Sequence, residues 1–405
     1  MRKIAIILGL TILLPAYSCK KTLDLKNPNS TNLPTIDAAR AGLVNVVTAD
    51  LSRVNALLAQ NTFIVNNLIV TQSTVGSSDI KYPYTNLYQF VLLNTDEIYR
   101  KAKTIDTLEA RFLFWLGNNM LYQQFEEPMQ YEVLGQISGK TITKEYLENG
   151  INQYIATSLQ YTPQDTDATK ALKNKFVRLS YFLLLKLAMD EADYVRASEM
   201  LLALGKDVDG TEVGFSNKYA YSYEYLGTAP NDNNWVRYWL GTNTISVDAV
   251  SLGIFKSPNE KAFLPLPMEE IKKVKHMRFF NAQQSLEILG EIEFNFIKAE
   301  LLARAGASAD DIKTALEAGL KANSQRTNNT ATIDLSHITD FNLNEVKRLK
   351  YKVFFGHYAF MADLRRWEKE NAIIFSFING DGRGDILKAR SDNGFPKKYK
   401  YIIGG

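Results

Sequence analysis

The chain has a single cysteine, Cys19, and three histidines among its 405 residues. A disulfide within the chain is therefore impossible, and metal sites built from several thiolates and imidazoles have too few ligands. Neither sign of charge dominates, since 47 Lys and Arg residues stand against 44 Asp and Glu residues. A nucleic-acid-binding protein would need a basic excess on one face. We therefore expect no metal, no other cofactor and no nucleic-acid partner.

Long hydrophobic runs are also missing. The apolar run at residues 4–14 is too short to span ~30 Å of hydrocarbon as a helix. It follows Arg2 and Lys3 and leads through small residues to Cys19, which is the order of an export signal. We interpret residues 1–18 as a lipoprotein signal peptide and Cys19 as the lipidation site, where acyl chains would anchor the protein. Plain secretory cleavage and an uncleaved anchor are the alternatives.

The remainder is organised as a tether and one large domain. Residues 19–34 are polar and rich in Asn, so they are expected to hold the domain away from the lipid. Residues 35–405 form the predicted domain, in which apolar residues recur at helical spacing, so the predicted fold class is mainly α. Thr35 is positioned to cap the first helix. Helices are expected at residues 35–60, 85–102, 109–125, 144–159, 170–189, 194–204, 284–305, 309–323 and 343–367.

Two consecutive pairs of these helices are typical of tetratricopeptide-like hairpins. Residues 170–189 pair with 194–204, and residues 289–305 pair with 309–323, each across a short turn. The small side chains of Ala197 and Ala315 would permit close helix approach. The pairs are not tandem at a period of ~34 residues, so a dispersed helical scaffold is expected in place of a regular solenoid. An irregular helical domain is the alternative.

Residues 205–283 interrupt the helical pattern with many glycines, prolines and asparagines. An irregular insertion of this length in a compact protein is usually functional or disordered. This one is rich in aromatic residues, which argues against disorder. We therefore interpret it as a functional insertion in the helical domain.

Five segments match the motifs of one known family in the correct order: residues 19–28, 88–94, 109–125, 263–267 and 363–367. On these segments the chain resembles the SusD/RagB family of outer-membrane lipoproteins from Bacteroidetes. It departs from the family pattern at residues 355–358, where Phe-Glu-Gly-Arg is usual, and Asp24 is the only acidic residue shortly after Cys19. The chain is also short for the family. These departures indicate a compact or divergent member.

The resemblance implies a SusD-like helical fold with tetratricopeptide-like pairs. It also implies a lipid-anchored position in the outer membrane, facing the cell surface, as a lid over a SusC-like TonB-dependent barrel. Family members bind oligosaccharides or, in some cases, oligopeptides, so nutrient binding and delivery is the expected function. The family takes ligand aromatics from the irregular insertion and from the loop before the second helix. That loop is residues 72–84 here, and it carries Tyr82 and Tyr84.

The insertion holds side chains suited to a sugar ligand. Sugar rings stack their C–H faces on aromatic rings, while their hydroxyls need amides or charged groups nearby. Asn234, Trp235, Arg237, Tyr238 and Trp239 supply this combination within one short segment. We predict that they contact the ligand. The alternative is that these rings pack the insertion against the helical body.

Upstream of that segment, Tyr219, Tyr221, Tyr223 and Tyr225 alternate at strand spacing, which would place the four rings on one face. Tyr223 and Tyr225 are therefore added to the predicted ligand residues. Such a strand could also present an edge to an extended peptide. Oligopeptide binding thus remains open beside glycan binding.

An enzyme is not expected. The histidines are isolated from one another, and no nucleophile elbow or phosphate-binding loop is present. A glycoside hydrolase needs only two suitably spaced carboxylates, so it stays a weaker alternative, as does an envelope adhesin. Asp363 and the arginines that follow it are interpreted as structural, because Asp363 can pair with an arginine one turn away.

Overall fold

The computed structural model of the chain describes residues 34–51, 62–66, 69–71, 77–102, 105–132, 137–224, 245–247, 286–326, 335, 338, 340–354, 357–370 and 398–399. The predicted signal peptide, Cys19 and nearly all of the tether lie outside this part of the chain, as does most of the insertion.

The described part is mostly helical, as predicted. Its α-helices are α2 (Ile36–Asn45), α4 (Ser77–Asn86), α5 (Leu93–Lys101), α6 (Asp106–Gln124), α7 (Lys144–Ser158), α8 (Asp167–Asp190), α9 (Tyr194–Leu204), α13 (Glu291–Arg304), α14 (Ala309–Arg326), α15 (Leu343–Val353) and α16 (Phe360–Lys369). Two π-helical segments and a 3-10 turn add η1 (Val46–Leu51), η2 (Leu87–Leu92) and η3 (Asn217–Tyr219). The strands are β1 (Thr62–Asn66), β2 (Ile69–Thr71), β3 (Met129–Tyr131), β4 (Ile137–Thr141), β5 (Tyr221–Tyr223), β6 (Ile245–Val247) and β7 (Leu286–Leu289).

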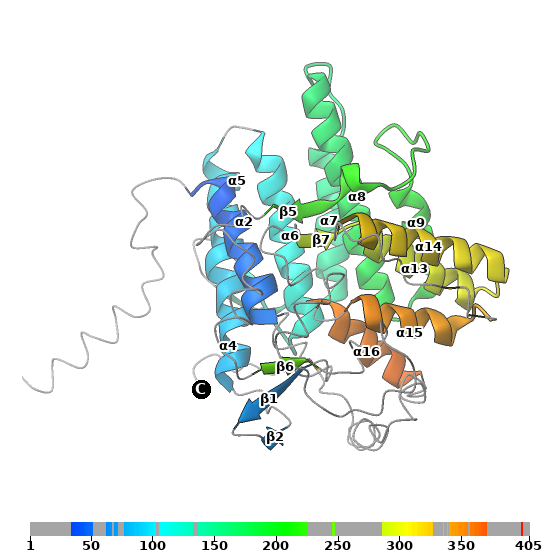
Figure 1. The fold of residues 1–405 in the computed structure, drawn as a ribbon. Coiled ribbons are helices and arrows are strands. Elements are labelled where there is room, and N and C mark those ends of the chain that lie inside the picture. Colours follow the sequence, from blue (N-terminus) through cyan, green and yellow to red (C-terminus); the bar gives the residue numbers. More distant parts are fainter. Residues whose placement is uncertain are drawn as a thin grey trace, which may run out of the picture.

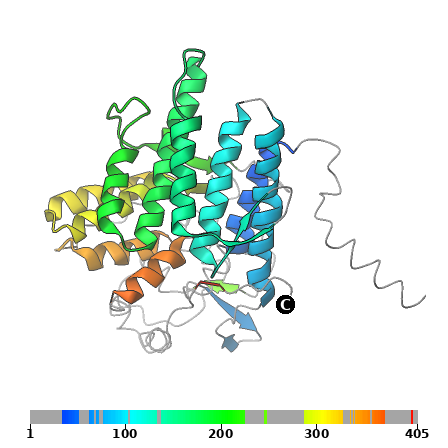
Figure 2. The ribbon, with the colours of Figure 1, turned by 180° about the vertical axis from the view of Figure 1, so that it is seen from behind.

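The helices lie side by side in an array that runs from α2 at one edge to α14 at the other (Figures 1 and 2). α6 and α8 form its centre and are buried on most sides. The rings of Phe112 on α6 and Phe176 on α8 lie 5.3 Å apart, centroid to centroid, and both side chains are buried. Burial of each such side chain stabilises the fold by ~1.5–3 kcal/mol. The core is thus continuous along the array.

Side-chain caps define where several helices begin. The predicted cap holds, since Thr35 Oγ1 accepts a hydrogen bond from the backbone N–H of Ala38. A helix start leaves backbone N–H groups without partners inside the helix, so an accepting side chain there stabilises it by ~1 kcal/mol. The same role is filled at later helices by Thr143, Thr166, Asp193 and Asn342.

Both predicted tetratricopeptide-like hairpins are present, as α8 with α9 and as α13 with α14. Ala197 and Ala315 are buried, in agreement with a close approach of the helices. The turn of the second hairpin contains Gly306 at φ +69°, a conformation that glycine adopts without a steric penalty. The first hairpin turns through Ala192 at φ +57°.

Several predicted helices have different bounds in the structure. The second helix begins at Ser77 and contains the π-helical segment η2. The expected helix at residues 284–305 opens instead with strand β7, because β7 pairs with the distant β5. The expected helix at 343–367 is split into α15 and α16. Buried Phe354 and Tyr358 flank the break, so the interruption turns both rings into the core.

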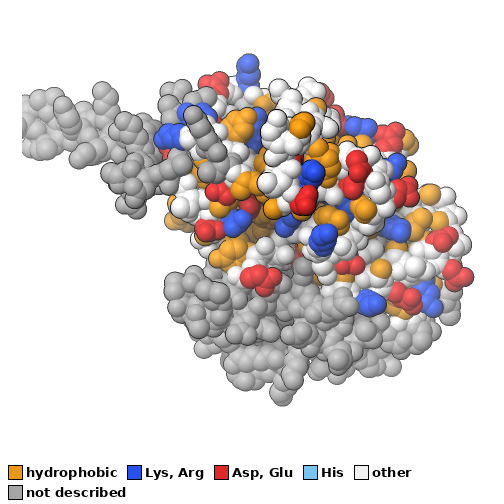
Figure 3. All heavy atoms as spheres, turned by 90° about the horizontal axis from the view of Figure 1, so that it is seen from above, with side chains coloured by type: hydrophobic (Ala, Val, Ile, Leu, Met, Phe, Trp, Pro, Cys, Tyr) orange, Lys and Arg blue, Asp and Glu red, His pale blue; other side chains and the backbone are white. Residues whose placement is uncertain are grey.

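The surface mixes charge and apolar groups. On the face seen in Figure 3, acidic and basic side chains are interspersed and neither sign gathers into a patch. Within the described residues, no helix has both the length and the apolar character needed to cross a bilayer.

Candidate ligand-binding region

Most of the predicted ligand residues fall outside the described part of the chain, so their contacts stay predictions. They are Tyr225, Asn234, Trp235, Arg237, Tyr238 and Trp239. Three predicted ligand residues are described, and the structure places them in three different environments. Tyr82 is exposed, Tyr84 is buried and Tyr223 is partly buried against the core.

Tyr82 has the exposure that a ligand contact requires. Its side chain lies on α4 and is 58% exposed, and the neighbouring Lys81 is also exposed. The helical turn around it is fixed locally, because Thr85 Oγ1 donates a hydrogen bond of 3.0 Å to the carbonyl of Lys81. Tyr82 therefore presents a ring and a hydroxyl to solvent from a regular helix.

Tyr84 corrects the sequence prediction. It is only 3% exposed, and its ring packs 4.9 Å from that of Tyr88 and 5.0 Å from that of Phe125. The prediction took residues 72–84 as a loop, whereas α4 already begins at Ser77. Two residues apart on a helix are separated by ~200°. Tyr82 and Tyr84 therefore face opposite sides, and Tyr84 belongs to the core.

The alternating tyrosines also correct a prediction. Tyr219 and Tyr221 are buried, and only Tyr223 keeps partial exposure. The Tyr221 hydroxyl donates a hydrogen bond of 2.8 Å to Glu109 Oε1 on α6. The Tyr219 ring lies 3.9 Å from the guanidinium carbon of Arg178 on α8. These two rings attach the base of the insertion to the helical body and do not form an open face.

Strand β5 does form, but it pairs antiparallel with β7, with Tyr221 opposite Leu289 and Tyr223 opposite Leu286. The register shifts between Tyr221 and Ser222. A strict alternation of rings on one face is lost where the register shifts, because side-chain direction depends on a regular pleat.

A three-stranded sheet joins the chain just before the predicted ligand loop, residues 72–84, to residues 245–247 of the insertion. β1 is its central strand, with β2 on one side and β6 on the other. β6 belongs to the insertion and pairs antiparallel with β1, with Ile64 opposite Ile245. β2 ends at Thr71, shortly before α4 and its Tyr82. The sheet and α4 lie at the same end of the molecule (Figures 1 and 2).

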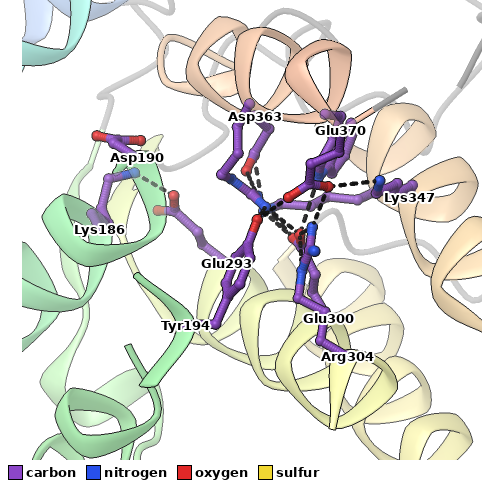
Figure 4. A network of polar contacts seen from close by, with 12 residues as sticks. Lys186, Asp190, Tyr194, Glu293, Glu300, Arg304, Lys347, Asp363 and Glu370 are labelled. Atoms are coloured by element: carbon purple, nitrogen blue, oxygen red, sulfur yellow. Dashed lines mark hydrogen bonds and ion pairs between the residues drawn. The ribbon is translucent and has the colours of Figure 1, made fainter. Parts of the chain in front are cut away.

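The C-terminal signature forms a buried charge network around Glu300 of α13 (Figure 4). Arg366 donates to both carboxylate oxygens of Glu300, at 2.5 and 3.0 Å, and the indole N–H of Trp367 donates at 3.0 Å. Arg304 lies 2.8 Å from the same carboxylate and Lys350 lies 3.8 Å from it. The Glu300 carboxylate is therefore surrounded by donors and has no room to act as a catalytic base.

The network continues through Asp363 and Glu370. Asp363 pairs with Arg366 at 2.7 Å, one turn away as predicted, and with Lys350 at 2.9 Å. Glu370 pairs with Arg304 at 2.7 Å and accepts a hydrogen bond from the hydroxyl of Tyr194 on α9. These contacts join α9, α13, α15 and α16, so the signature acts as a structural tie between the two helical hairpins and the C-terminal helices.

A second polar cluster lies beside this network, at the end of α8 (Figure 4). Lys186 forms a buried ion pair with Glu293 of α13. One turn further, the Asp190 carboxylate accepts a hydrogen bond of 2.5 Å from the Gln123 amide. Burial raises the pKa of Asp190 to about 6, although Lys186 acts in the opposite direction.

Asp190 should make the stability of the fold depend on pH. Its pKa is about 6 when folded and ~3.9 in an unfolded chain, so the unfolded chain loses this proton first. The contribution of Asp190 is therefore most favourable below about pH 4, falls between about pH 4 and 6, and is constant above. We expect Asp190→Asn to raise the free energy of unfolding at pH 7 by ~1–2 kcal/mol, with little change at pH 4. Urea titrations at both pH values measure this, and an equal effect at both would contradict it.

Within the described residues, no group of three or more His, Cys, Asp or Glu side chains could hold an ion. His357 is buried, with its ring 5.2 Å from that of Phe354 and 4.7 Å from that of Tyr358. His276 and His337 lie outside the described residues.

Comparison with known proteins identifies the fold. No family model matches the chain, and no curated protein matches it. A solved structure of a chitin-binding SusD homolog from Flavobacterium johnsoniae is similar to it, with a TM-score of 0.55 and 15% identity, covering 82% of this chain and 86% of that chain. A SusD/RagB family protein from Bacteroides thetaiotaomicron has a TM-score of 0.59 and 12% identity, covering 85% and 88%.

A further SusD homolog from Bacteroides thetaiotaomicron is similar with a TM-score of 0.59 and 12% identity, covering 83% of this chain and 85% of that one. At these identities the likeness is one of architecture, and it extends over most of the described helices and strands. The resemblance noted in the sequence is confirmed at this level. The chain has the SusD-like fold.

Proposed function

We propose that the protein is a lipid-anchored outer-membrane protein that binds a glycan nutrient and delivers it to a SusC-like TonB-dependent barrel. The observation that supports this most is the SusD-like fold over more than four fifths of the chain, shared with a structure described as chitin-binding. Cys19, after its short apolar run, supplies the lipidation site.

The proposed ligand surface combines Tyr82 with the aromatic segment of the insertion. Trp239 stands six positions before Ile245, the first residue of β6. Six residues reach at most ~20 Å, so from the pairing of β6 with β1 we infer that Trp239 lies within reach of the α4 end of the molecule. Tyr82 is exposed on α4 at that end. Aromatic rings brought together in this way suit the C–H faces of successive sugar units.

Binding is tested by calorimetric titration of the mature protein against a panel of neutral glycans, acidic glycans and short peptides. We expect a glycan to bind with a Kd in the micromolar range or weaker, which corresponds to ~8 kcal/mol or less. The double variant Trp235→Ala/Trp239→Ala and the single variant Tyr82→Ala should each weaken binding by ~tenfold or more, because each removes a stacking surface.

The control is Leu202→Ala, which removes a 71% exposed apolar side chain from α9. It should leave the affinity unchanged. Wild-type affinity in folded Trp and Tyr variants would contradict the proposed surface.

Binding of peptides alone would favour the oligopeptide alternative. New reducing ends after incubation with a bound glycan, above a boiled control, would show that the protein is a hydrolase.

A further inference from the structure

Arg111 on α6 lies inside a collar of aromatic rings formed by Tyr99, Phe114 and Trp115. The distances from the guanidinium carbon to the three ring centroids are 4.6, 5.2 and 5.3 Å. Phe114 and Trp115 follow Arg111 by three and four positions, so they share its face of α6, while Tyr99 comes from α5. Trp115 is itself held by Tyr146 of α7, at 5.5 Å between ring centroids. The aromatic collar therefore holds the cation in a set position.

The guanidinium of Arg111 has no ion-pair or hydrogen-bond partner within the described part of the chain. On α5, Asp96 is engaged by Arg100 at 2.8 Å and by the hydroxyl of Tyr131 at 3.1 Å. The Glu97 carboxylate lies 3.5 Å from a lysine one turn along α5.

Glu109 is the acidic residue of α6 closest in sequence to Arg111, but its carboxylate is bound by other side chains. Its carboxylate accepts hydrogen bonds from Arg40 at 2.5 and 2.6 Å and from Tyr221 at 2.8 Å. Asp96, Glu97 and Glu109 thus each serve another partner. The positive charge of Arg111 is left without a counter-charge among these neighbours.

This setting differs from those of Arg366 on α16 and Arg40 on α2. Arg366 and Arg40 each hold a carboxylate through two hydrogen bonds. Arg111 is partly exposed, and the contacts that its guanidinium makes within the described part of the chain are with the three rings. A guanidinium held against rings keeps its N–H donors in its own plane, where they suit the two oxygens of a carboxylate. Rings also exclude water, so an incoming anion competes with less hydration.

We propose that Arg111 and its aromatic collar bind the carboxylate of an acidic sugar unit. The guanidinium takes the carboxylate, and the ring of Tyr99, which is 42% exposed, offers a face for the C–H groups of the sugar. This proposal rests on the proposed function, in which the ligand is a glycan. It specifies that the glycan contains uronic acid units. The end of α5 and the start of α6 lie away from the β1, β2 and β6 sheet, so this is a second, separate site (Figure 1).

The direct test is a titration of the protein with galacturonate, followed by the side-chain N–H signals of its four tryptophans in nitrogen-15 NMR spectra. The Trp115 signal is assigned by its loss in Trp115→Phe. Galacturonate should shift this signal, and neutral galactose should not. Raising the salt concentration should weaken the effect, because the contact is ionic.

Three variants sharpen the test. Arg111→Gln should raise the Kd for galacturonate by ~tenfold or more, since it removes a charge-assisted pair. Arg111→Lys keeps the charge but loses the planar fork, so an intermediate loss is expected. Arg196→Gln is the matched control, because it removes one positive charge from the exposed Arg196–Glu199 pair on α9. It should bind as the wild type does. Unchanged melting temperatures show that the variants are folded.

Each remaining outcome decides the inference. An equal shift by galactose, or an unchanged shift in Arg111→Gln, overturns it, as does no shift at all. If neutral glycans still bind to the wild type in that case, the proposed function survives alone. A galacturonate shift that depends on Arg111 supports the site even where no neutral glycan binds. A tetraglutamate peptide that binds as well as tetragalacturonate would overturn the assignment to a sugar.

Discussion

Glu300→Gln is expected to lower the free energy of unfolding by ~3–5 kcal/mol, the typical effect of removing one partner from a buried ion pair. Glu300 is fully buried, and Arg366 and Lys350 are almost fully buried beside it. Without the carboxylate, these cations would remain in the interior with only Asp363 to balance them. Urea denaturation at pH 7, followed by circular dichroism, measures the change.

The same carboxylate should make the fold sensitive to acid. Burial by itself would raise the pKa of Glu300, but Arg366 and Lys350 outweigh it and hold the pKa well below its usual range. A carboxyl whose pKa is lower in the folded state stabilises the fold fully above its unfolded pKa of ~4.3, and this contribution is lost as the pH falls below that value. The wild type should therefore lose stability below about pH 4.5 more steeply than the variant.

The matched control is Glu317→Gln, which breaks the exposed pair with Lys313 on α14. Surface pairs of this kind contribute ~0.5 kcal/mol or less. The double variant Glu300→Gln/Arg366→Met should cost less than the two single variants added together, since it removes both charges of the closest pair. A loss below ~1 kcal/mol for Glu300→Gln would contradict the role given to the network.

Gly150→Ala is the second change with a large expected effect, a loss of ~2–4 kcal/mol of stability from overpacking. Gly150 lies inside α7, where alanine would normally stabilise a helix by ~1 kcal/mol. Here an added Cβ would lie less than 3.0 Å from three carbons of the Trp115 indole. Trp115 is buried and is packed against Phe114 and Tyr146, so it cannot move aside without disturbing both.

Thermal and urea unfolding of Gly150→Ala measure the effect. Gly139→Ala on β4 is the control, because an added Cβ there meets no atom within 4 Å. Adding Trp115→Phe to Gly150→Ala should recover part of the lost stability, since the smaller ring vacates the space that the methyl group needs. A stable Gly150→Ala protein would show that α6 and α7 can separate at low cost.

Glu300 and Gly150 both lie in contacts that hold the helices of the proposed binding sites in place. The Glu300 network joins the helical hairpins to α15 and α16. Helix α16 in turn contacts the end of α6, through the hydrogen bond of 3.0 Å from Arg365 to the Gln123 carbonyl. The contact of Gly150 with Trp115 sets the position of one ring of the aromatic collar around Arg111. Ligand affinity should therefore be measured only in those variants of either support that remain folded.

Local signals in the sequence were sufficient for the helices and their pairing. Apolar periodicity and caps such as Thr35 act over a few residues, so they are readable without the fold. The hairpins α8–α9 and α13–α14 follow from helices joined by short turns. The mainly helical class and the SusD-like resemblance also rest on such ordered local motifs.

Contacts between distant residues had to come from the tertiary structure. The strand β7 depends on its pairing with β5, and the buried state of Tyr84 depends on the helix beginning at Ser77. Arg111 lies in the motif at residues 109–125 but was not predicted as a ligand residue, because its surroundings depend on Tyr99 of another helix and on acidic groups that serve other partners.

By itself, the sequence determined the helical class and the two hairpins, since each depends on residues that are neighbours along the chain. The export signal at residues 1–18 stays a prediction. Only the tertiary structure decided which tyrosines face solvent and how Glu300 pairs with Arg366, 66 positions away in the sequence. It also decided that the neighbouring acidic side chains of Arg111 bind other partners. Burial and charge compensation are properties of the whole assembly of helices, because they depend on every group within a few ångströms and not on sequence separation.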